Sequence, residues 1–205
     1  MVKSGSEDTR DRLIDATLDL VAAHGFDGVS VGDIEAGAGL APRSGALYKY
    51  FDSKLAVLEA GLERHLGSVA GMGDDLATAA LVDASAEIGL IARQLLAELD
   101  RERTITHVIE REGDRLPELR DRMREGISER GYRISAAFIE RWSDEVGAEG
   151  IDSEALSVLL IGSLINLRRS TWTFGATPLG VDDDRIVDTF VALSTSFLDH
   201  VASTV

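Results

Sequence analysis

Residues 30–54 limit the possible folds of this chain more than any other segment, because they carry start and stop signals of short helices in quick succession. Ser30 can cap a helix over the residues that follow, and Asp33 lies three positions on, where its carboxylate can reach back to the cap. Gly37 or Gly39 can supply the positive φ angle that ends this helix. The segment therefore predicts a helix-turn-helix, in which the second helix is presented to a DNA major groove.

The second helix of this motif is expected to begin near Pro42, because proline is tolerated in a first helical turn. Leu47 and Phe51 are four residues apart and would face inward together. Ser53 then caps a further helix. The polar, small and aromatic residues of the segment are left for contacts with DNA. The predicted DNA-contacting residues are Ser30, Arg43, Ser44, Gly45, Ala46, Tyr48, Lys49, Tyr50 and Lys54.

Less specific interpretations of these residues stay open. Tyr48 and Tyr50 could be aromatic residues of the core and its rim, and Arg43 could be a solvated surface charge. Lys49 and Lys54 are candidates for phosphate contacts, which position a protein on DNA without reading its sequence.

The segment resembles the DNA-binding domain of the TetR family of bacterial transcriptional regulators. That family has a Thr/Ser-led helix, an Ala-Gly-apolar turn, a Leu-Tyr-x-His-Phe helix and then Ser-Lys. The resemblance is at the level of motifs over about residues 10–66 and architectural beyond them. The matching pieces are Ser30, Asp33-Ile34, Ala38-Gly39-Leu40, Gly45-Ala46-Leu47-Tyr48-Lys49-Tyr50-Phe51 and Ser53-Lys54.

The chain departs from this family pattern at several positions. The family has five residues from the apolar residue of the turn to the Leu of Leu-Tyr, whereas Leu40 and Leu47 are seven apart. Gly32 stands where a basic or polar DNA-contacting residue is common, Tyr50 replaces the usual His, and Leu55 replaces the usual Glu. The extra length is expected to lengthen the turn or the start of the second helix.

The net charge of the whole chain argues against DNA binding. The formal charge is −15, from 21 basic and 36 acidic residues, whereas a DNA-binding protein is expected to carry a basic footprint. Between Arg43 and Lys54, however, three basic residues stand against one acid, Asp52. We expect a local positive patch, with an acidic remainder that suppresses nonspecific binding to DNA.

The rest of the chain is expected to be helical as well. Helical patterns extend over residues 9–24, from Ser53 onward, and then near 82–100, 102–112, 117–146, 153–172 and 183–202. Gly67, Gly71 and Gly73 mark a domain boundary. We therefore predict an all-α chain of about nine helices, with a three-helix DNA-binding domain over 1–66 and a ligand-binding and dimerisation domain over 74–205.

The last two predicted helices favour a dimer. Residues 153–172 are apolar on nearly all sides, and residues 183–202 have a wide apolar face. The resemblance implies that these helices pair with their copies in a second subunit, which a two-site operator also requires. The predicted interface residues are Leu160, Leu164, Phe190, Phe197 and Val201.

The resemblance also implies a mostly apolar effector pocket in the second domain. The aromatic residues of this domain are first of all core candidates, and two polar residues of the most apolar helix could anchor a ligand or a dimer partner. The candidate ligand-contacting residues are Met123, Phe138, Trp142, Asn166, Arg168 and Trp172. No metal or cofactor is expected, because the pair His107 and Glu110 offers too few ligands.

The sequence gives little support for an enzyme. None of the four His follows a Glu at the spacing of a di-iron bundle, and the chain has no Gly-x-Ser-x-Gly, no P-loop and no Cys. No apolar run is long enough to cross a membrane and no signal peptide is evident, so we expect a cytoplasmic protein. The expected function is a ligand-responsive homodimeric regulator, most simply a repressor of a pseudo-palindromic operator. The alternative is an all-helical interaction or scaffold protein that has lost sequence-specific DNA binding.

Overall fold

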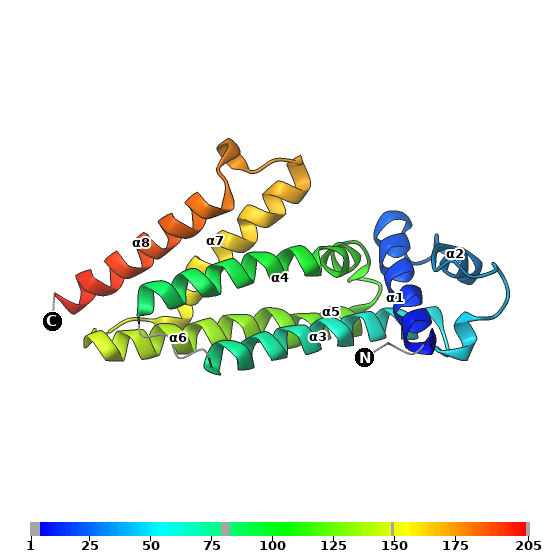
Figure 1. Cartoon of the computed structure of the whole chain (residues 1–205), viewed down its shortest axis with the longest axis horizontal. Coiled ribbons are helices and arrows are strands. Elements are labelled where there is room, and N and C mark those ends of the chain that lie inside the picture. Colours follow the sequence, from blue (N-terminus) through cyan, green and yellow to red (C-terminus); the bar gives the residue numbers. More distant parts are fainter. Residues whose placement is uncertain (1–4, 79–82, 149, 204–205) are drawn as a thin grey trace. The chain divides into compact units, whose positions relative to one another are not determined.

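The computed structural model describes residues 5–78, 83–148 and 150–203, and every regular element within these ranges is helical (Figure 1). The all-α prediction is therefore confirmed. The α-helices are α1 (Gly5–His24), α2 (Val31–Gly37), α3 (Lys54–Thr78), α4 (Ala84–Glu112), α5 (Pro117–Met123), α6 (Arg130–Val146), α7 (Ser153–Phe174) and α8 (Asp183–Ala202). Three shorter segments are the 3-10 turns η1 (Leu47–Lys49) and η3 (Pro178–Gly180) and the π-helical η2 (Arg124–Glu129).

The chain forms two compact units that do not follow a single cut in the sequence. Unit 1 comprises the described residues up to Ser68 together with Glu102–Ile127, and unit 2 comprises those of Val69–Arg101 and Ser128–Val205. Helices α3 and α4 therefore each contribute to both units. α3 is helical through residues 67–73, because a glycine costs an interior helical position only about 1 kcal/mol. The division into domains 1–66 and 74–205 stays a prediction.

Unit 1 is built on α1. Its apolar residues recur at helical spacing, and Leu13, Ile14 and Val21 are fully buried. α2 can approach α1 closely because Gly37 has no side chain; a Cβ there would lie 3.2 Å from the Cβ of Ala16. The end of α4 belongs to the same unit, where Arg111 donates to the backbone oxygen of Ala23 (3.1 Å) at the end of α1.

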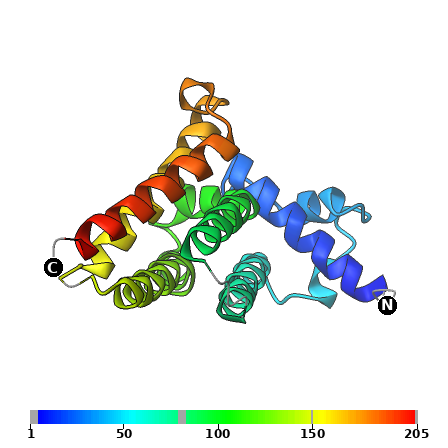
Figure 2. The same ribbon diagram turned by 60° about the vertical axis from the view of Figure 1, so that its left-hand side comes forward.

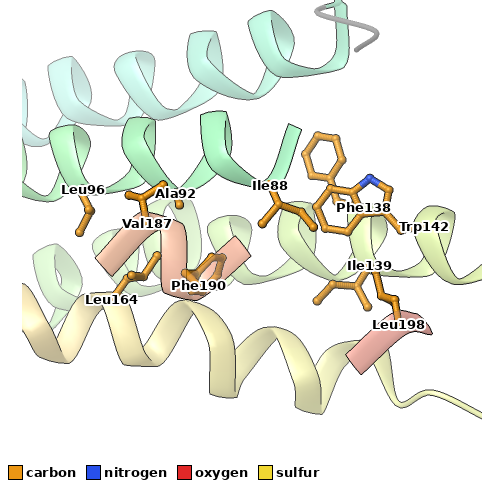
Figure 3. Close-up of a cluster of buried hydrophobic side chains, with 10 residues drawn as sticks. All are labelled: Ile88, Ala92, Leu96, Phe138, Ile139, Trp142, Leu164, Val187, Phe190 and Leu198. Atoms are coloured by element: carbon orange, nitrogen blue, oxygen red, sulfur yellow. The ribbon is translucent and has the colours of Figure 1, made fainter. Parts of the chain in front are cut away.

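Unit 2 has a core to which four helices contribute (Figure 3). α6 packs against both α7 and α8, and the two views in Figures 1 and 2 show α7 and α8 running side by side in opposite directions. The core residues are Ile88, Ala92 and Leu96 on α4, Phe138, Ile139 and Trp142 on α6, Leu164 on α7, and Val187, Phe190 and Leu198 on α8.

Most predicted helices are found close to their predicted bounds. The pattern over 117–146 corresponds to α5, η2 and α6, which follow one another without a break. The patterns over 82–100 and 102–112 are one helix, α4. The second helix of the helix-turn-helix, expected from Pro42 onward, was wrongly predicted: the backbone from Ala41 to Tyr50 contains only the three-residue turn η1.

Candidate nucleic-acid interface

The start of α2 has the geometry that the sequence predicted. The hydroxyl of Ser30 accepts from the N–H of Asp33 (3.2 Å), and the carboxylate of Asp33 accepts from the N–H of Ser30 (2.9 Å). These reciprocal bonds satisfy two donors that a helix start leaves free. Hydrogen bonds from the side chain and backbone of Ser30 lower the pKa of Asp33. The predicted cap is confirmed, and it fixes where α2 begins.

The end of α2 is also as predicted. Gly39 has φ +71°, which ends the helix in a sharp turn. The guanidinium of Arg12, on α1, donates to the backbone oxygen of Ala38 (3.0 Å). A cation placed at the C-terminal end of a helix also complements its dipole. The positive φ of Gly39 and the hydrogen bond from Arg12 together fix the backbone of the turn. The following segment begins from this turn.

The segment from Ala41 to Tyr50, which we call the reading loop, replaces the expected second helix. Arg43 and Gly45 both have positive φ angles, +59° and +71°. An α-helix cannot pass through such residues, because all its residues have negative φ. Helical hydrogen bonding begins only at Ala46, whose backbone oxygen accepts from the N–H of Lys49 (3.2 Å). The backbone oxygen of Leu47 then accepts from the N–H of Phe51 (3.0 Å).

Leu47 and Phe51 still face inward, as their spacing predicted. Leu47 is fully buried and Phe51 is 7% exposed. One helical turn is sufficient to bring two side chains four residues apart to the same side. The prediction of their burial was therefore right although the helix that it assumed is not formed.

A buried carboxylate lies beneath the reading loop. Glu35, on α2, is fully buried. Its Oε2 accepts from the backbone N–H of Ser44 (3.0 Å) and its Oε1 from that of Leu47 (3.1 Å). The sequence analysis did not single out Glu35. The available signal was only an acid directly after the apolar Ile34.

Burial and hydrogen bonding act on the Glu35 carboxyl in opposite directions. Burial alone would raise its pKa, because the charged form loses its hydration. Backbone N–H groups of the reading loop, chiefly those of Leu47 and Ser44, favour the charged form and leave the pKa below its usual value. Glu35 is therefore an anion at neutral pH.

Arg43 and Gly32 face each other across the turn. A Cβ at Gly32 would lie only 3.1 Å from the Cγ of Arg43. The stem of Arg43 thus passes over the place where another residue at position 32 would have its side chain. Gly32 itself carries no polar side chain, and the structure brings the stem of Arg43 from the reading loop close to it.

Several predicted DNA-contacting residues are exposed together on the reading loop and α2. Tyr48 is 60% exposed, and Ser30, Arg43, Ser44 and Lys49 are also exposed. The three remaining loop residues of the predicted set, Gly45, Ala46 and Tyr50, are half-buried.

Lys54 lies differently from the other members of this set. Its ammonium group donates to the backbone oxygens of Phe26 and Val29, the latter at 2.7 Å, and lies 4.1 Å from the centre of the Phe26 ring. The structure thus places this cation against the turn between α1 and α2.

The candidate ligand-contacting residues do not form one cluster. Phe138 and Trp142 stack in unit 2 with ring centres 5.8 Å apart, and the indole N–H of Trp142 donates to Glu87 (3.0 Å). Asn166 is exposed, and the indole of Trp172 donates to Asp100 (3.4 Å). The sixth candidate, Met123, lies in unit 1.

Arg168 is paired within its own chain. Its guanidinium donates to both carboxylate oxygens of Asp183 (2.9 and 2.6 Å) and lies 3.4 Å from Asp100. The hydrogen bonds from Arg168 lower the pKa of Asp183. Arg168 therefore joins α7 to α8 and α4, a role that neither of its predicted uses included.

An apolar cavity of about 280 Å³ lies between α6, α7 and α8. Its lining consists of Ile139, Trp142, Leu156, Leu159, Leu160, Ser163, Leu193, Ser194, Phe197 and Leu198. Several of these side chains are also exposed, among them Leu159 at 71%, Leu193 at 61% and Phe197 at 40%. The cavity therefore opens onto an apolar surface of α7 and α8.

The predicted dimer residues divide between this surface and the core. Leu164 and Phe190 are buried in the core of unit 2. Phe197 is exposed, and Leu160 and Val201 are half-buried. The structure adds Val158, Leu159 and Leu193, all more than half exposed. We call Val158, Leu159, Leu193 and Phe197 the α7/α8 apolar surface.

Neither a metal site nor a membrane-spanning helix is found within the described ranges. There, no three His, Asp or Glu side chains come together in a way that could hold a metal ion. No helix of the described chain is both long and apolar enough to span a membrane.

Comparison with known proteins shows what the N-terminal region resembles in sequence. Residues 13–60 match the model of the bacterial regulatory proteins of the tetR family. A segment of 68 residues is 38% identical to the mycofactocin biosynthesis transcriptional regulator MftR of Mycobacterium tuberculosis. This segment spans 33% of the present chain and 33% of that regulator.

Solved structures extend the similarity to the whole fold. A TetR-family transcriptional regulator from Mesorhizobium loti matches with a TM-score of 0.66 at 19% identity, over 96% of this chain and 97% of that one. FadR of Bacillus subtilis, solved in complex with stearoyl-CoA, matches with a TM-score of 0.58 at 21% identity, over 95% and 98%. The resemblance to the TetR family is confirmed, in sequence for the N-terminal region and in fold for the rest.

Proposed function

We propose that this chain, similar to TetR-family regulators in its N-terminal sequence and in its fold, is a ligand-responsive transcriptional regulator of the cytoplasm. It binds a pseudo-palindromic DNA operator as a homodimer, acts as a repressor, and is released by a small molecule. Residues 1–66 form the DNA-binding domain, and residues 74–205 form the ligand-binding and dimerisation domain. No enzymatic step is part of this function.

The observation that carries the proposal is the exposed set on the reading loop. Arg43, Tyr48 and Lys49 are exposed on a segment that follows a capped helix and a fixed turn. Arginine, lysine and tyrosine side chains are common donors to phosphate and base edges.

Dimerisation is supported by the α7/α8 apolar surface. Exposure of these leucine and phenylalanine side chains to water is unfavourable, and their burial would lower the free energy. They lie along two helices of one unit. A second copy that presents the same surface would bury them in an isologous interface. Two reading loops related by a two-fold axis would then fit two half-sites of opposite direction.

A mostly apolar effector is supported by the cavity beside this surface. Its volume of about 280 Å³ lies near the lower end of the range for small-molecule pockets, about 300–1,000 Å³. Its lining includes the apolar side chains of Ile139 and Trp142. FadR of Bacillus subtilis holds stearoyl-CoA, which carries a long apolar chain, and we extend to the present protein only the apolar character of that ligand.

Release is proposed to occur by a population shift. An effector that binds one conformation better moves the equilibrium toward it, and here that conformation spaces the two reading loops wrongly for DNA. α4 is one continuous helix with residues in both units, so it can carry such a change. Linkage requires that operator DNA weakens effector binding by the same factor. Equal effector affinity with and without operator would disprove this mechanism.

Arg43→Ala tests the DNA-binding role directly. A base contact by Arg43 predicts relaxed specificity at one operator position. A phosphate contact predicts weaker binding to all sequences alike and a salt slope reduced by about 1. Arg185→Ala, which removes the same charge from an exposed position on α8, is the matched control. Operator affinities that are equal for the two variants would contradict the proposal.

A further inference from the structure

We propose that Glu35 is a positioning residue for DNA recognition: its buried carboxylate holds the reading loop in the conformation that presents Arg43 and Tyr48 to the operator. This inference rests on the proposed function and deepens it. Glu35 itself touches no DNA, because its side chain is fully buried. It acts through the backbone of residues that lie nine and twelve positions further along the chain.

The two hydrogen bonds use the two oxygens of one carboxylate. Oε2 accepts from Ser44 and Oε1 from Leu47, at 3.0 and 3.1 Å. These N–H groups lie on either side of Gly45, one of the two residues of the loop with positive φ. The carboxylate therefore fixes the direction of the chain on both sides of its sharpest bend. Hydrogen bonds to a charged acceptor are stronger than those between neutral groups.

The loop has little else to define its backbone. Between the end of α2 and η1 it forms no helical ladder, and its one local backbone bond before Ala46 joins the N–H of Ser44 to the oxygen of Ala41 at 3.3 Å, within the described chain. Loop segments without such ladders lose substantial conformational entropy when they are ordered. If the loop were mobile in the free protein, that entropy would be lost again each time it bound DNA.

Glu35 also explains where Arg43 lies. Arg43 precedes Ser44, the first residue held by the carboxylate, and its own backbone has φ +59°. With Ser44 fixed, the Arg43 stem passes over Gly32, where a side chain would be only 3.1 Å away. Three features thus form one arrangement: the glycine at position 32, the positive φ of Arg43 and the buried acid at position 35. This arrangement presents Arg43 beside the start of α2.

Glu35→Gln is the variant that tests this role. Glutamine has the same shape but no charge, and it can accept only through one oxygen, so at least one of the two loop N–H groups loses its bond to residue 35. Asp52→Asn is the matched control, because it removes the same charge from an exposed position next to the loop. This control matters because the loss of any acid near DNA favours phosphate binding.

Two readouts separate the effect of Glu35 on the order of the loop from its effect on operator binding. The first is amide hydrogen exchange in the free protein, where Glu35→Gln should accelerate exchange at Ser44 and Leu47 by at least about tenfold, while α7 and α8 are unchanged. The second is binding to the selected operator and to random duplex. Operator affinity should fall by about 10- to 100-fold, the factor expected for lost hydrogen bonds to a charged group. Affinity for random duplex should be the same as that of Asp52→Asn.

The possible outcomes are distinguishable. Unchanged exchange at Ser44 and Leu47 overturns the inference at its first step. Accelerated exchange with an unchanged ratio of operator to random affinity also overturns it, because Glu35 would then serve the stability of the fold alone. If the wild-type protein selects no operator at all, the proposed function fails and the role of Glu35 in recognition fails with it, whereas the exchange result still reports whether the carboxylate holds the loop.

Discussion

Lys54 shows, at the scale of one residue, how a charge expected at the DNA surface can be used inside the fold. Its ammonium group bonds two backbone oxygens of the turn after α1 and lies over the ring of Phe26. The sequence predicts a cation at this position but not its direction, because the acceptors are more than 20 residues away. The ion pair of Arg168 with Asp183, 15 residues further along the chain and on another helix, likewise could not be derived from helix periodicity.

Lys54→Met should reduce stability rather than DNA affinity. Methionine keeps most of the apolar stem and removes the charge, so the hydrogen bonds to the turn and the contact with the ring are lost. We expect the free energy of unfolding to fall by about 1–3 kcal/mol in urea titrations. The dependence of operator affinity on salt should keep its slope. A slope lowered by about 1 would show that Lys54 contacts a phosphate after all.

The pair of Arg168 and Asp183 predicts a pH-dependent contribution to stability. The hydrogen bonds from Arg168 lower the pKa of Asp183 in the folded protein. A carboxyl with a lowered folded pKa contributes stability above its unfolded pKa, about 3.9, and loses it as the pH falls through the folded value.

Asp183→Asn should therefore destabilise the protein at pH 7 by about 1–2 kcal/mol, a modest amount because Asp183 is half exposed. The difference from wild type should shrink below about pH 4. Urea midpoints at pH 7, 5 and 3.5 measure it. A difference that is the same at all three values would rule out ionisation of Asp183 as its source.

At the scale of elements, local signals predicted helix ends better than they predicted whether a helix forms. Ser30 and Gly39 bound α2 as expected, since caps and positive φ angles depend on a few neighbouring residues. The helix expected from Pro42 is absent because Arg43 and Gly45 have positive φ angles, and the N–H groups of Ser44 and Leu47 bond instead to Glu35, on another element. A contact between elements cannot be read from either one alone.

Ser30→Ala tests the start of α2. Alanine cannot accept the bond from Asp33, so α2 should lose about 1 kcal/mol of stability. Ser53→Ala, which removes the corresponding bond to Ala56 at the start of α3, is the matched control. We expect both variants to unfold at lower urea concentration, while only Ser30→Ala weakens operator binding. Equal losses of operator affinity in both would mean that the effect is one of general stability.

At the scale of the whole molecule, the chain combines an acidic composition with a local basic site and an apolar surface. The charge of −15 predicts repulsion from bulk DNA, so binding depends on the few cations of the reading loop. The sequence predicted broad apolar faces on the last two helices, and the α7/α8 apolar surface lies on them; their role in a dimer stays a prediction. The sequence did not predict that Leu164 and Phe190 are buried within one subunit, because periodicity does not show which of two apolar faces meets the chain's own core.

Leu159→Glu should separate the subunits. A charge on the α7/α8 apolar surface would have to be buried without a partner in the proposed dimer. Leu179→Glu is the matched control, because Leu179 is 99% exposed but lies on η3, outside that surface. Analytical ultracentrifugation should show a monomer for Leu159→Glu and a dimer for Leu179→Glu. A dimer in both would place the interface elsewhere.

The most direct test of the central claim is selection of bound duplexes from a randomised DNA pool, followed by binding of the selected duplex across a salt series. A dimeric, sequence-specific regulator should enrich an inverted repeat, with half-sites about one helical turn or more apart and an affinity well above that for random duplex. This affinity should fall as salt rises. No enrichment, with binding no stronger than that of an unrelated acidic protein, would contradict the claim and leave a TetR-like fold used as a scaffold.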